Sequence, residues 1–155
     1  MPNVKTNTCP IPQNVNNGSA IIQNSTGACG TACGTGTAPS NVLTCFTAGS
    51  NDSILDQLTV CTDEASTIRV LSFWLYDGSS VYTFIGAISI PLTSGITGAI
   101  PVVDVLGSAI FLGLCYDAGG RPIMKVKAGY SIVVGSQVAV TSGKTLHVKA
   151  SGADY

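Results

Sequence analysis

Short β-prone segments separated by turn sequences fill residues 41–155, and this pattern constrains the fold more than any other feature of the chain. Apolar and polar residues alternate within the segments, and none carries the sustained 3.6-residue apolar period of a capped helix. About eight segments at roughly ten-residue spacing are typical of an antiparallel two-sheet β-sandwich. We therefore expect an all-β fold, most simply jelly-roll-like, although the same pattern also fits an immunoglobulin-like or barrel topology.

Turn residues divide these segments from one another. Asp77 and Gly78 make a strong hairpin signal between residues 67–76 and 81–90. Residues 67–76 are apolar on both faces, so we expect a central strand or one that a partner covers. Residues 108–116 fit either a strand or a short helix. The segments expected as strands are residues 42–47, 54–62, 67–76, 81–90, 99–105, 122–126, 130–140 and 145–150.

The last two of these segments alternate most clearly. In residues 130–140, the pattern places Val138 on the same face as Ile132 and Val134. In residues 145–150, Leu146, Val148 and Ala150 are expected to point inward, and Thr145, His147 and Lys149 outward.

Residues 1–40 have a different composition. Proline at positions 2, 10, 12 and 39 disfavours regular ladders, and residues 25–40 contain no large apolar side chain. We interpret residues 1–40 as an extended N-terminal arm rich in Cys, Gly and Thr, with one short strand at residues 20–23. A β-sandwich domain over residues 41–155 would follow it. The same composition also fits a disordered tail.

Charge is scarce along the whole chain. Lys5 is the only charged residue among the first 51, and charged residues make up 10% of the sequence, against about 25% in ordinary soluble domains. Neighbouring molecules are therefore expected to cover much of the surface, as in an assembly. The net charge of −1 and the scattered basic residues do not favour nucleic acid as a partner. No stretch approaches the roughly 20 apolar residues of a spanning helix, and the start lacks a signal-peptide core, so we expect synthesis in a cytoplasm.

Residues that could carry chemistry are few. A Ser-His or Cys-His mechanism would have to use His147, the one histidine, which its neighbours place on a solvated or interface-facing side. Asp77 and Asp117 lie in turn sequences, where aspartate caps backbone N–H groups. We expect neither an enzyme nor a cofactor. The aromatic residues beside the hairpin are expected to pack in the core and across strands, rather than to form a platform for sugars or bases.

Six cysteines leave three alternatives open: free structural thiols, disulfides, or a metal site. Cys29 and Cys33 are the only close pair, and they are our candidates for a disulfide or for metal ligands. Cys45, Cys61 and Cys115 lie in β-like or apolar stretches, which favours structural thiols. Cytoplasmic synthesis argues against early disulfide formation.

Four segments of the second half carry a family resemblance. They are Arg69 to Gly78, Ile85 to Pro91, Ala128 to Val134 and Ser151 to Tyr155, in the order of the chain. This order resembles that of a group of small virion proteins of tailed bacteriophages, over about residues 53–155. Ser151 stands where glycine is commoner, and the Cys-rich arm has no counterpart in the group.

The resemblance implies a non-enzymatic structural protein of the phage particle, made in the host cytoplasm. A capsid decoration or cement protein, bound to the major capsid protein on the virion surface, is the preferred interpretation. Self-association, with a trimer favoured, is expected, and neither nucleic acid nor a membrane is an expected partner. The alternative is a tail, baseplate or fibre-associated module for assembly or receptor binding.

Overall fold

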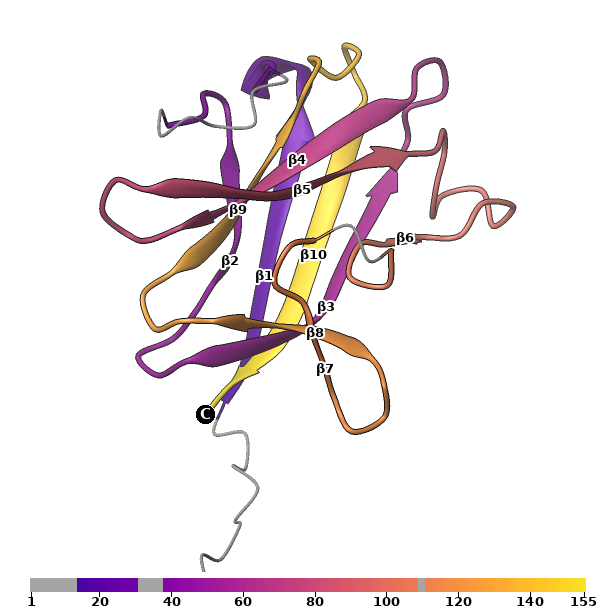
Figure 1. The fold of residues 1–155 in the computed structure, drawn as a ribbon. Coiled ribbons are helices and arrows are strands. Elements are labelled where there is room, and N and C mark those ends of the chain that lie inside the picture. The colour runs from indigo at the N-terminus through magenta and orange to yellow at the C-terminus, as the bar shows by residue number, and fades with distance from the viewer. Residues whose placement is uncertain (1–13, 31–37, 109–110) are drawn as a thin grey trace, which may run out of the picture.

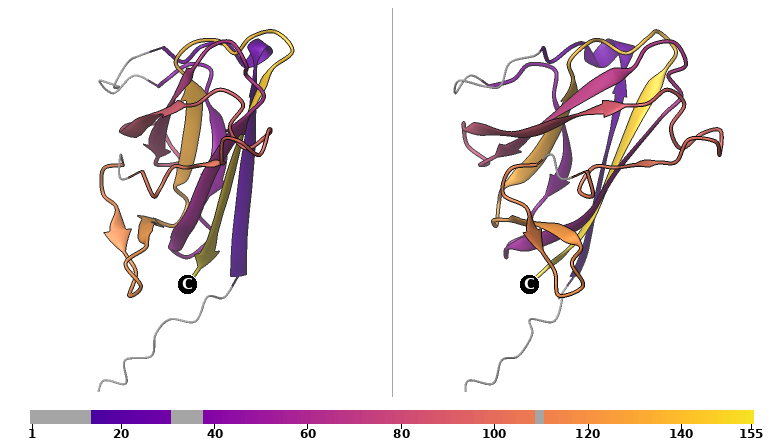
Figure 2. Two further views of the ribbon diagram at one scale, coloured as in Figure 1. Left: turned by 90° about the vertical axis from the view of Figure 1, so that its right-hand side faces the viewer. Right: turned by 45° about the vertical axis from the view of Figure 1, so that its right-hand side comes forward.

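The computed structural model describes residues 14–30, 38–108 and 111–155, which form two antiparallel β-sheets packed face to face (Figures 1 and 2). In these ranges the one helix is a single 3-10 turn, Asn24–Thr26, and no helix is long and apolar enough to cross a membrane. The predicted all-β, two-sheet sandwich is therefore confirmed.

One sheet has six strands and the other has four. The six-stranded sheet runs in the order β1 (Asn14–Gln23), β10 (Thr145–Asp154), β3 (Ser53–Thr62), β8 (Pro122–Val126) and β7 (Cys115–Tyr116), with β6 (Val103–Asp104) also paired to β3. The four-stranded sheet runs in the order β2 (Leu43–Thr47), β9 (Ser131–Ser136), β4 (Arg69–Tyr76) and β5 (Tyr82–Ile90).

The eight longer strands pair as if one long hairpin had been rolled into a sandwich. Strand β1 pairs with β10, β2 with β9, β3 with β8, and β4 with β5, all antiparallel. Successive strands along each half of the hairpin alternate between the two sheets. This is the jelly-roll-like arrangement that the sequence pattern favoured.

The core lies between the sheets and receives side chains from each of the eight longer strands. Leu146, Val148 and Ala150 of β10 are buried there, beside Leu58 and Val60 of β3. A fully buried leucine or valine side chain stabilises the fold by about 1.5–3 kcal/mol relative to an exposed one. The inward positions predicted for residues 145–150 are therefore confirmed.

Strand β4 is covered on both faces, as its sequence predicted. Phe73 faces the core, whereas Trp74 on the outer face is 1% exposed and packs with Cys29 and Val133. The cover comes from the same chain, because the Cys29 backbone N–H donates to the Ser136 carbonyl oxygen at 2.8 Å. A partner is thus not required to bury Trp74.

Strand β1 begins earlier than residues 20–23, where the sequence placed it. Residues 14–23 pair with β10 along their whole length, and Asn24 Nδ2 donates to the Val140 carbonyl oxygen at 2.7 Å. The sheet therefore includes residues on the arm side of the boundary expected at residue 41. The rest of the expected arm, at residues 1–13 and 31–37, lies outside the described residues.

Two expected strands are much shorter in the structure. Residues 99–105 contribute only β6, because Pro101 has no N–H group to donate and Gly95 and Gly98 turn the chain at positive φ. Strand β9 ends at Ser136, whose hydroxyl group donates to the Val138 carbonyl oxygen. Val138 is 61% exposed, whereas Ile132 and Val134 are buried, so the prediction that the three share a face was wrong. Among residues 108 and 111–116, which the structure describes, only 115–116 form a strand.

Gly18 lies where β1 and β2, the edge strands of the two sheets, approach each other closely. A Cβ atom at Gly18 would overlap the carbonyl oxygen of Cys45 in β2. We expect Gly18→Ala to destabilise the protein by about 1–3 kcal/mol, because the rigid backbone of β2 must shift. Urea unfolding measures this change. Ser19→Ala, at the exposed neighbouring position, should change stability by about 0.5 kcal/mol or less; equal effects of the two changes would contradict a steric role for Gly18.

Candidate functional site

Of the two cysteines proposed as a disulfide or metal pair, the structure describes Cys29. Cys29 is buried against Trp74 and Val133, and burial raises the pKa of its thiol. It thus has the apolar surroundings that its local sequence did not indicate. Cys33 lies outside the described residues, so the pairing stays a prediction.

The other described cysteines differ widely in exposure. Cys45 is 1% exposed, and burial raises the pKa of its thiol to about 12. Its S–H group donates to the Ile132 carbonyl oxygen, as suits a structural thiol. Cys61 is half-buried and Cys115 is exposed on β7, so Cys115 does not fill the core. No disulfide joins any two of the four described cysteines.

These environments predict a graded thiol reactivity. In the folded protein, a maleimide should label Cys115 rapidly and Cys45 at least about a hundredfold more slowly, since a buried protonated thiol is a poor nucleophile. Peptide mass spectrometry at short labelling times measures both sites. Denaturant should abolish the difference, and rapid native labelling of Cys45 would contradict its placement in the core.

Aromatic side chains near the β4–β5 hairpin pack against one another, as expected. Trp74 and Phe84 make an edge-to-face pair with ring centroids 5.9 Å apart. Tyr76 and Tyr82, directly opposite across the two strands, stack at 4.5 Å. Such cross-strand pairs stabilise a sheet by up to about 1 kcal/mol each.

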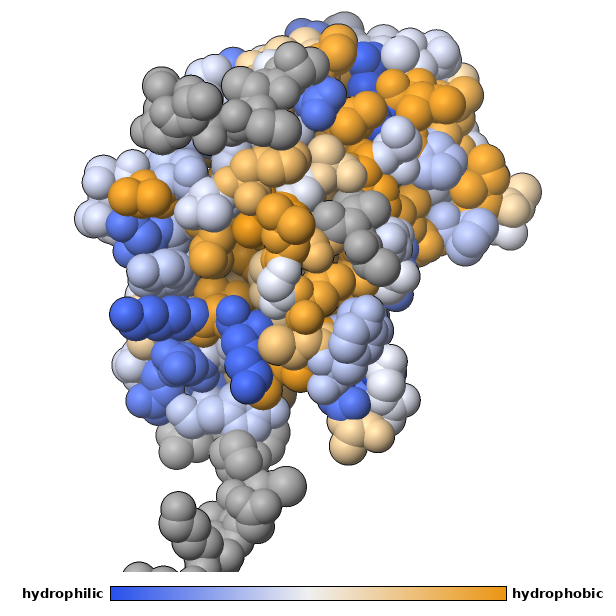
Figure 3. All heavy atoms as spheres, in the orientation of Figure 1, coloured by the Kyte–Doolittle hydropathy of each residue, from blue (hydrophilic) through white to orange (hydrophobic). Residues whose placement is uncertain are grey.

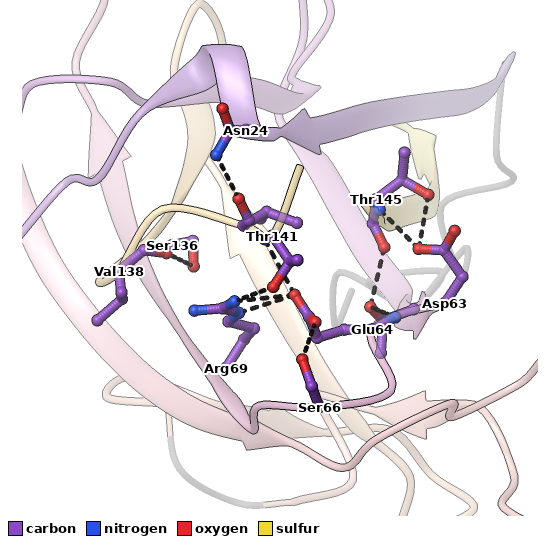
Figure 4. Close-up of polar contacts among 11 residues, drawn as sticks. Asn24, Asp63, Glu64, Ser66, Arg69, Ser136, Val138, Thr141 and Thr145 are labelled. Carbon is purple, nitrogen blue, oxygen red and sulfur yellow. Dashed lines mark hydrogen bonds and ion pairs between the residues drawn. The ribbon is translucent and has the colours of Figure 1, made fainter. Parts of the chain in front are cut away.

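A buried polar network ties together loops at one end of the sandwich (Figure 4). The Arg69 guanidinium group donates to Glu64 Oε2 at 2.9 and 3.1 Å and to Thr141 Oγ1 at 2.7 Å. The Thr141 backbone N–H donates to the same Glu64 oxygen at 3.1 Å. The side chains of Glu64 and Arg69 are only 1% and 6% exposed. Through these bonds the Glu64–Arg69 ion pair is tied to Thr141, which lies far from both residues in the sequence. The role of the network is structural.

The two acidic residues at this end stay ionised. Burial alone would raise the pKa of Glu64, but hydrogen bonds from Thr141 and Arg69, with the positive charge of Arg69, lower it to about 2. The Thr145 backbone N–H donates to Asp63 at 2.6 Å and is the main cause that lowers the pKa of Asp63. At neutral pH both carboxylates therefore accept hydrogen bonds and donate none.

Removing one member of the buried pair should be costly. We expect Glu64→Gln to destabilise the protein by about 3–5 kcal/mol, because it leaves the Arg69 charge buried without a counter-ion. Arg121→Gln is the matched control, since Arg121 pairs with Asp117 at the same distance but is 80% exposed; it should cost about 1 kcal/mol or less. Urea unfolding of both variants makes the comparison.

The same pair predicts an acid-dependent loss of stability. The folded-state pKa of Glu64 is about 2, below its ordinary value of 4.5, so its stabilising contribution is complete above pH 4.5 and is lost as the pH falls towards 2. In Glu64→Gln this part of the pH dependence should be missing. An unchanged acid transition in the variant would contradict the assignment.

Other carboxylates cap turns, as predicted. Asp77 accepts backbone N–H groups from Ser79, Ser80 and Val81, and these bonds hold its pKa well below the usual range. Asp117 accepts backbone N–H groups at the 117–121 turn. These side chains are occupied by the backbone of their own turns.

The outer face of the six-stranded sheet brings together residues that the sequence keeps apart. The strand register places Ile21 of β1, His147 of β10 and Cys61 of β3 in one row across three strands. The next outward row consists of Ser19, Lys149 and Thr59. His147 and Lys149 are exposed, so the predicted outward orientation of both is confirmed.

These rows form the floor of an apolar groove, which we call the outer-face groove. Its volume is about 520 Å³. The loop at residues 95–102 supplies one wall through Ile96 and Val102, which are 55% and 47% exposed, and Ile21, 47% exposed, lines the groove from β1. The remaining lining residues are Ser19, Ala20, Thr59, Cys61, His147, Val148 and Lys149. The groove is the main candidate binding surface in the described residues.

Sequence reasoning missed the outer-face groove, because its floor depends on the pairing of β1 with β10 and of β10 with β3. The outward alternation of residues 145–150 gave the only usable signal. Comparison of the sequence with protein-family models and with curated proteins finds no match.

Proposed function

We propose that this protein is a non-enzymatic structural component of a tailed-bacteriophage particle, most consistent with a capsid decoration protein that stabilises the head. The resemblance of residues 53–155 to small virion proteins supports this proposal. The jelly-roll-like sandwich supports it by analogy, since viral capsid proteins often use this architecture for structural roles.

The observation that carries the proposal is the concentration of exposed aliphatic side chains on the outer-face groove. Ile21, Ile96 and Val102 are about half exposed and line one continuous groove. Contiguous exposed apolar surface on a soluble protein marks a contact site. His147 and Lys149 lie beside these side chains, which gives an apolar centre with a polar margin, as in protein–protein interfaces.

A second apolar surface lies on the side of the molecule that carries β5. Figure 3 shows apolar side chains gathered across this face, in front of β5 and the connection that leads to β8. Leu112 and Tyr116 of that connection are 69% and 64% exposed. Two apolar surfaces suit a protein that contacts both its own copies, for which we favour a trimer, and the major capsid protein.

The low charge density fits surfaces that become buried on assembly. An unpaired charge that is removed from water costs several kcal/mol, whereas aliphatic and hydroxyl side chains lose little. A standard interface buries about 1,600 Å² in total, and repetition over a shell multiplies its effect. The proposed location is the capsid surface.

Charge insertion into the outer-face groove tests the proposal. Heads that lack this protein would be mixed with the purified protein, and saturable binding would be measured by co-sedimentation. We expect Ile21→Asp combined with Val102→Asp to weaken binding at least about tenfold, because the new carboxylates must be desolvated.

Val138→Asp, at a 61% exposed position between β9 and β10 and outside the outer-face groove, is the control and should bind like the unmodified protein. Reconstruction of the particles locates the bound protein. Density on the tail or baseplate would replace the capsid assignment with the alternative of a tail-associated module, and an absence of binding to any part of the particle would overturn the proposal.

A further inference from the structure

Cys61 and His147 form a thiol–imidazole pair on the floor of the outer-face groove. They are directly opposite each other on β3 and β10, and both line the groove. Side chains at such positions have Cβ atoms about 4.5–5.5 Å apart, so a thiol and an imidazole ring can reach each other. The two residues are 86 positions apart in the sequence, and only the strand register unites them.

Hydrogen bonds fix the orientation and the tautomer of His147. The Thr145 hydroxyl group donates its single proton to the Asp63 carboxylate at 3.2 Å. The same hydroxyl oxygen lies 3.2 Å from His147 Nε2. Because its proton is already engaged, this oxygen can only accept, so Nε2 carries the hydrogen and donates it. In the neutral ring the lone pair is then on Nδ1.

The hydrogen bonds that link the Asp63 carboxylate, the Thr145 hydroxyl group and the His147 imidazole orient the ring, as the third residue of a nucleophilic triad orients its base. Asp63 is held ionised by the Thr145 backbone N–H. Thr145 therefore positions the ring through Nε2 and leaves the lone pair on Nδ1, while Cys61 is the residue directly opposite on β3. Lys149, two residues along β10 on the same face, adds a positive charge beside the pair.

The groove determines which electrophiles can approach. Ile21, Ile96 and Val102 provide an aliphatic channel beside Cys61, which suits an alkyl chain. Gly95 packs directly against Cys61 on one side, since a Cβ atom there would lie 2.7 Å from Cys61 Cβ, so an electrophile must approach the sulfur atom from the groove. A long-chain acyl group fits this lining, because its chain can lie in the groove while its carbonyl carbon faces the sulfur atom.

We propose that Cys61 is a site of S-acylation by a long-chain acyl thioester, with His147 as the base and Thr145 as its positioning residue. His147 Nδ1 takes the Cys61 proton, and the thiolate attacks the acyl carbonyl carbon. The carbon–sulfur bond of the donor breaks as the new thioester bond forms. The departing thiolate then takes the proton from the imidazolium, so the reaction needs no oxidant or reductant.

The test incubates the intact chain with octanoyl-N-acetylcysteamine. Acetyl-N-acetylcysteamine is the short-chain comparison. Peptide mass spectrometry locates and times the hydroxylamine-sensitive acyl adduct. We expect Cys61 to react at least about tenfold faster with the octanoyl donor than with the acetyl donor. Cys115, exposed and outside the groove, should show no chain-length preference and is the internal control.

Variants separate the base from general effects on the fold. His147→Gln should slow acylation of Cys61 about a hundredfold, within the range for loss of a general base. Thr145→Val should slow it, and Thr145→Ser, which keeps the hydroxyl group, should restore it. Circular dichroism must show that each variant is folded.

Two results would overturn the proposal. One is acylation of Cys61 no faster than that of Cys115. The other is an unchanged Cys61 rate in folded His147→Gln. Because every measurement uses the isolated protein, the outcome is independent of whether the protein binds phage heads.

Discussion

The pairing of the first described strand with the last is the interaction on which the rest of the structure depends. Strand β10 lies between β1 and β3, so it supplies backbone partners to both of them. It also contributes alternate side chains to the core and to the outer-face groove. Without this strand, the ladder of β1 would have no partner in the six-stranded sheet, and the row that joins Ile21, His147 and Cys61 would not exist.

Much of the fold could be predicted, because seven of the expected strands are apolar or alternating segments bounded by clear turn residues. The exceptions have physical reasons. Strand β1 is rich in Asn, Gly and Ser, so its β-structure comes from pairing with β10 more than from its own propensity. Val138 follows the alternation of β9, but the Ser136 hydroxyl group helps the chain to leave the sheet first. The outer-face groove required knowledge of register, which single-strand periodicity does not contain.

Some of the few charged residues are engaged within the molecule. Glu64 and Arg69 neutralise each other in the interior, and Asp77 and Asp117 are occupied by the turns that they cap. These internal contacts reduce further the charge that is available for contacts with other molecules. Aliphatic and hydroxyl groups define that surface, and its contacts with other molecules will depend on shape and apolar burial more than on electrostatic steering.

The position of β10 also affects the order in which the nascent chain can fold. Residues 14–23 leave the ribosome well before their partner strand, which spans residues 145–154. At about 5–20 residues per second, β1 waits roughly 6 to 25 s for that strand to be synthesised. Until then the edge of β3 that β10 will occupy has no partner either, and both edges can pair with other chains. The fold thus completes its larger sheet only after β10 has been synthesised, which makes the nascent chain a natural client for chaperones.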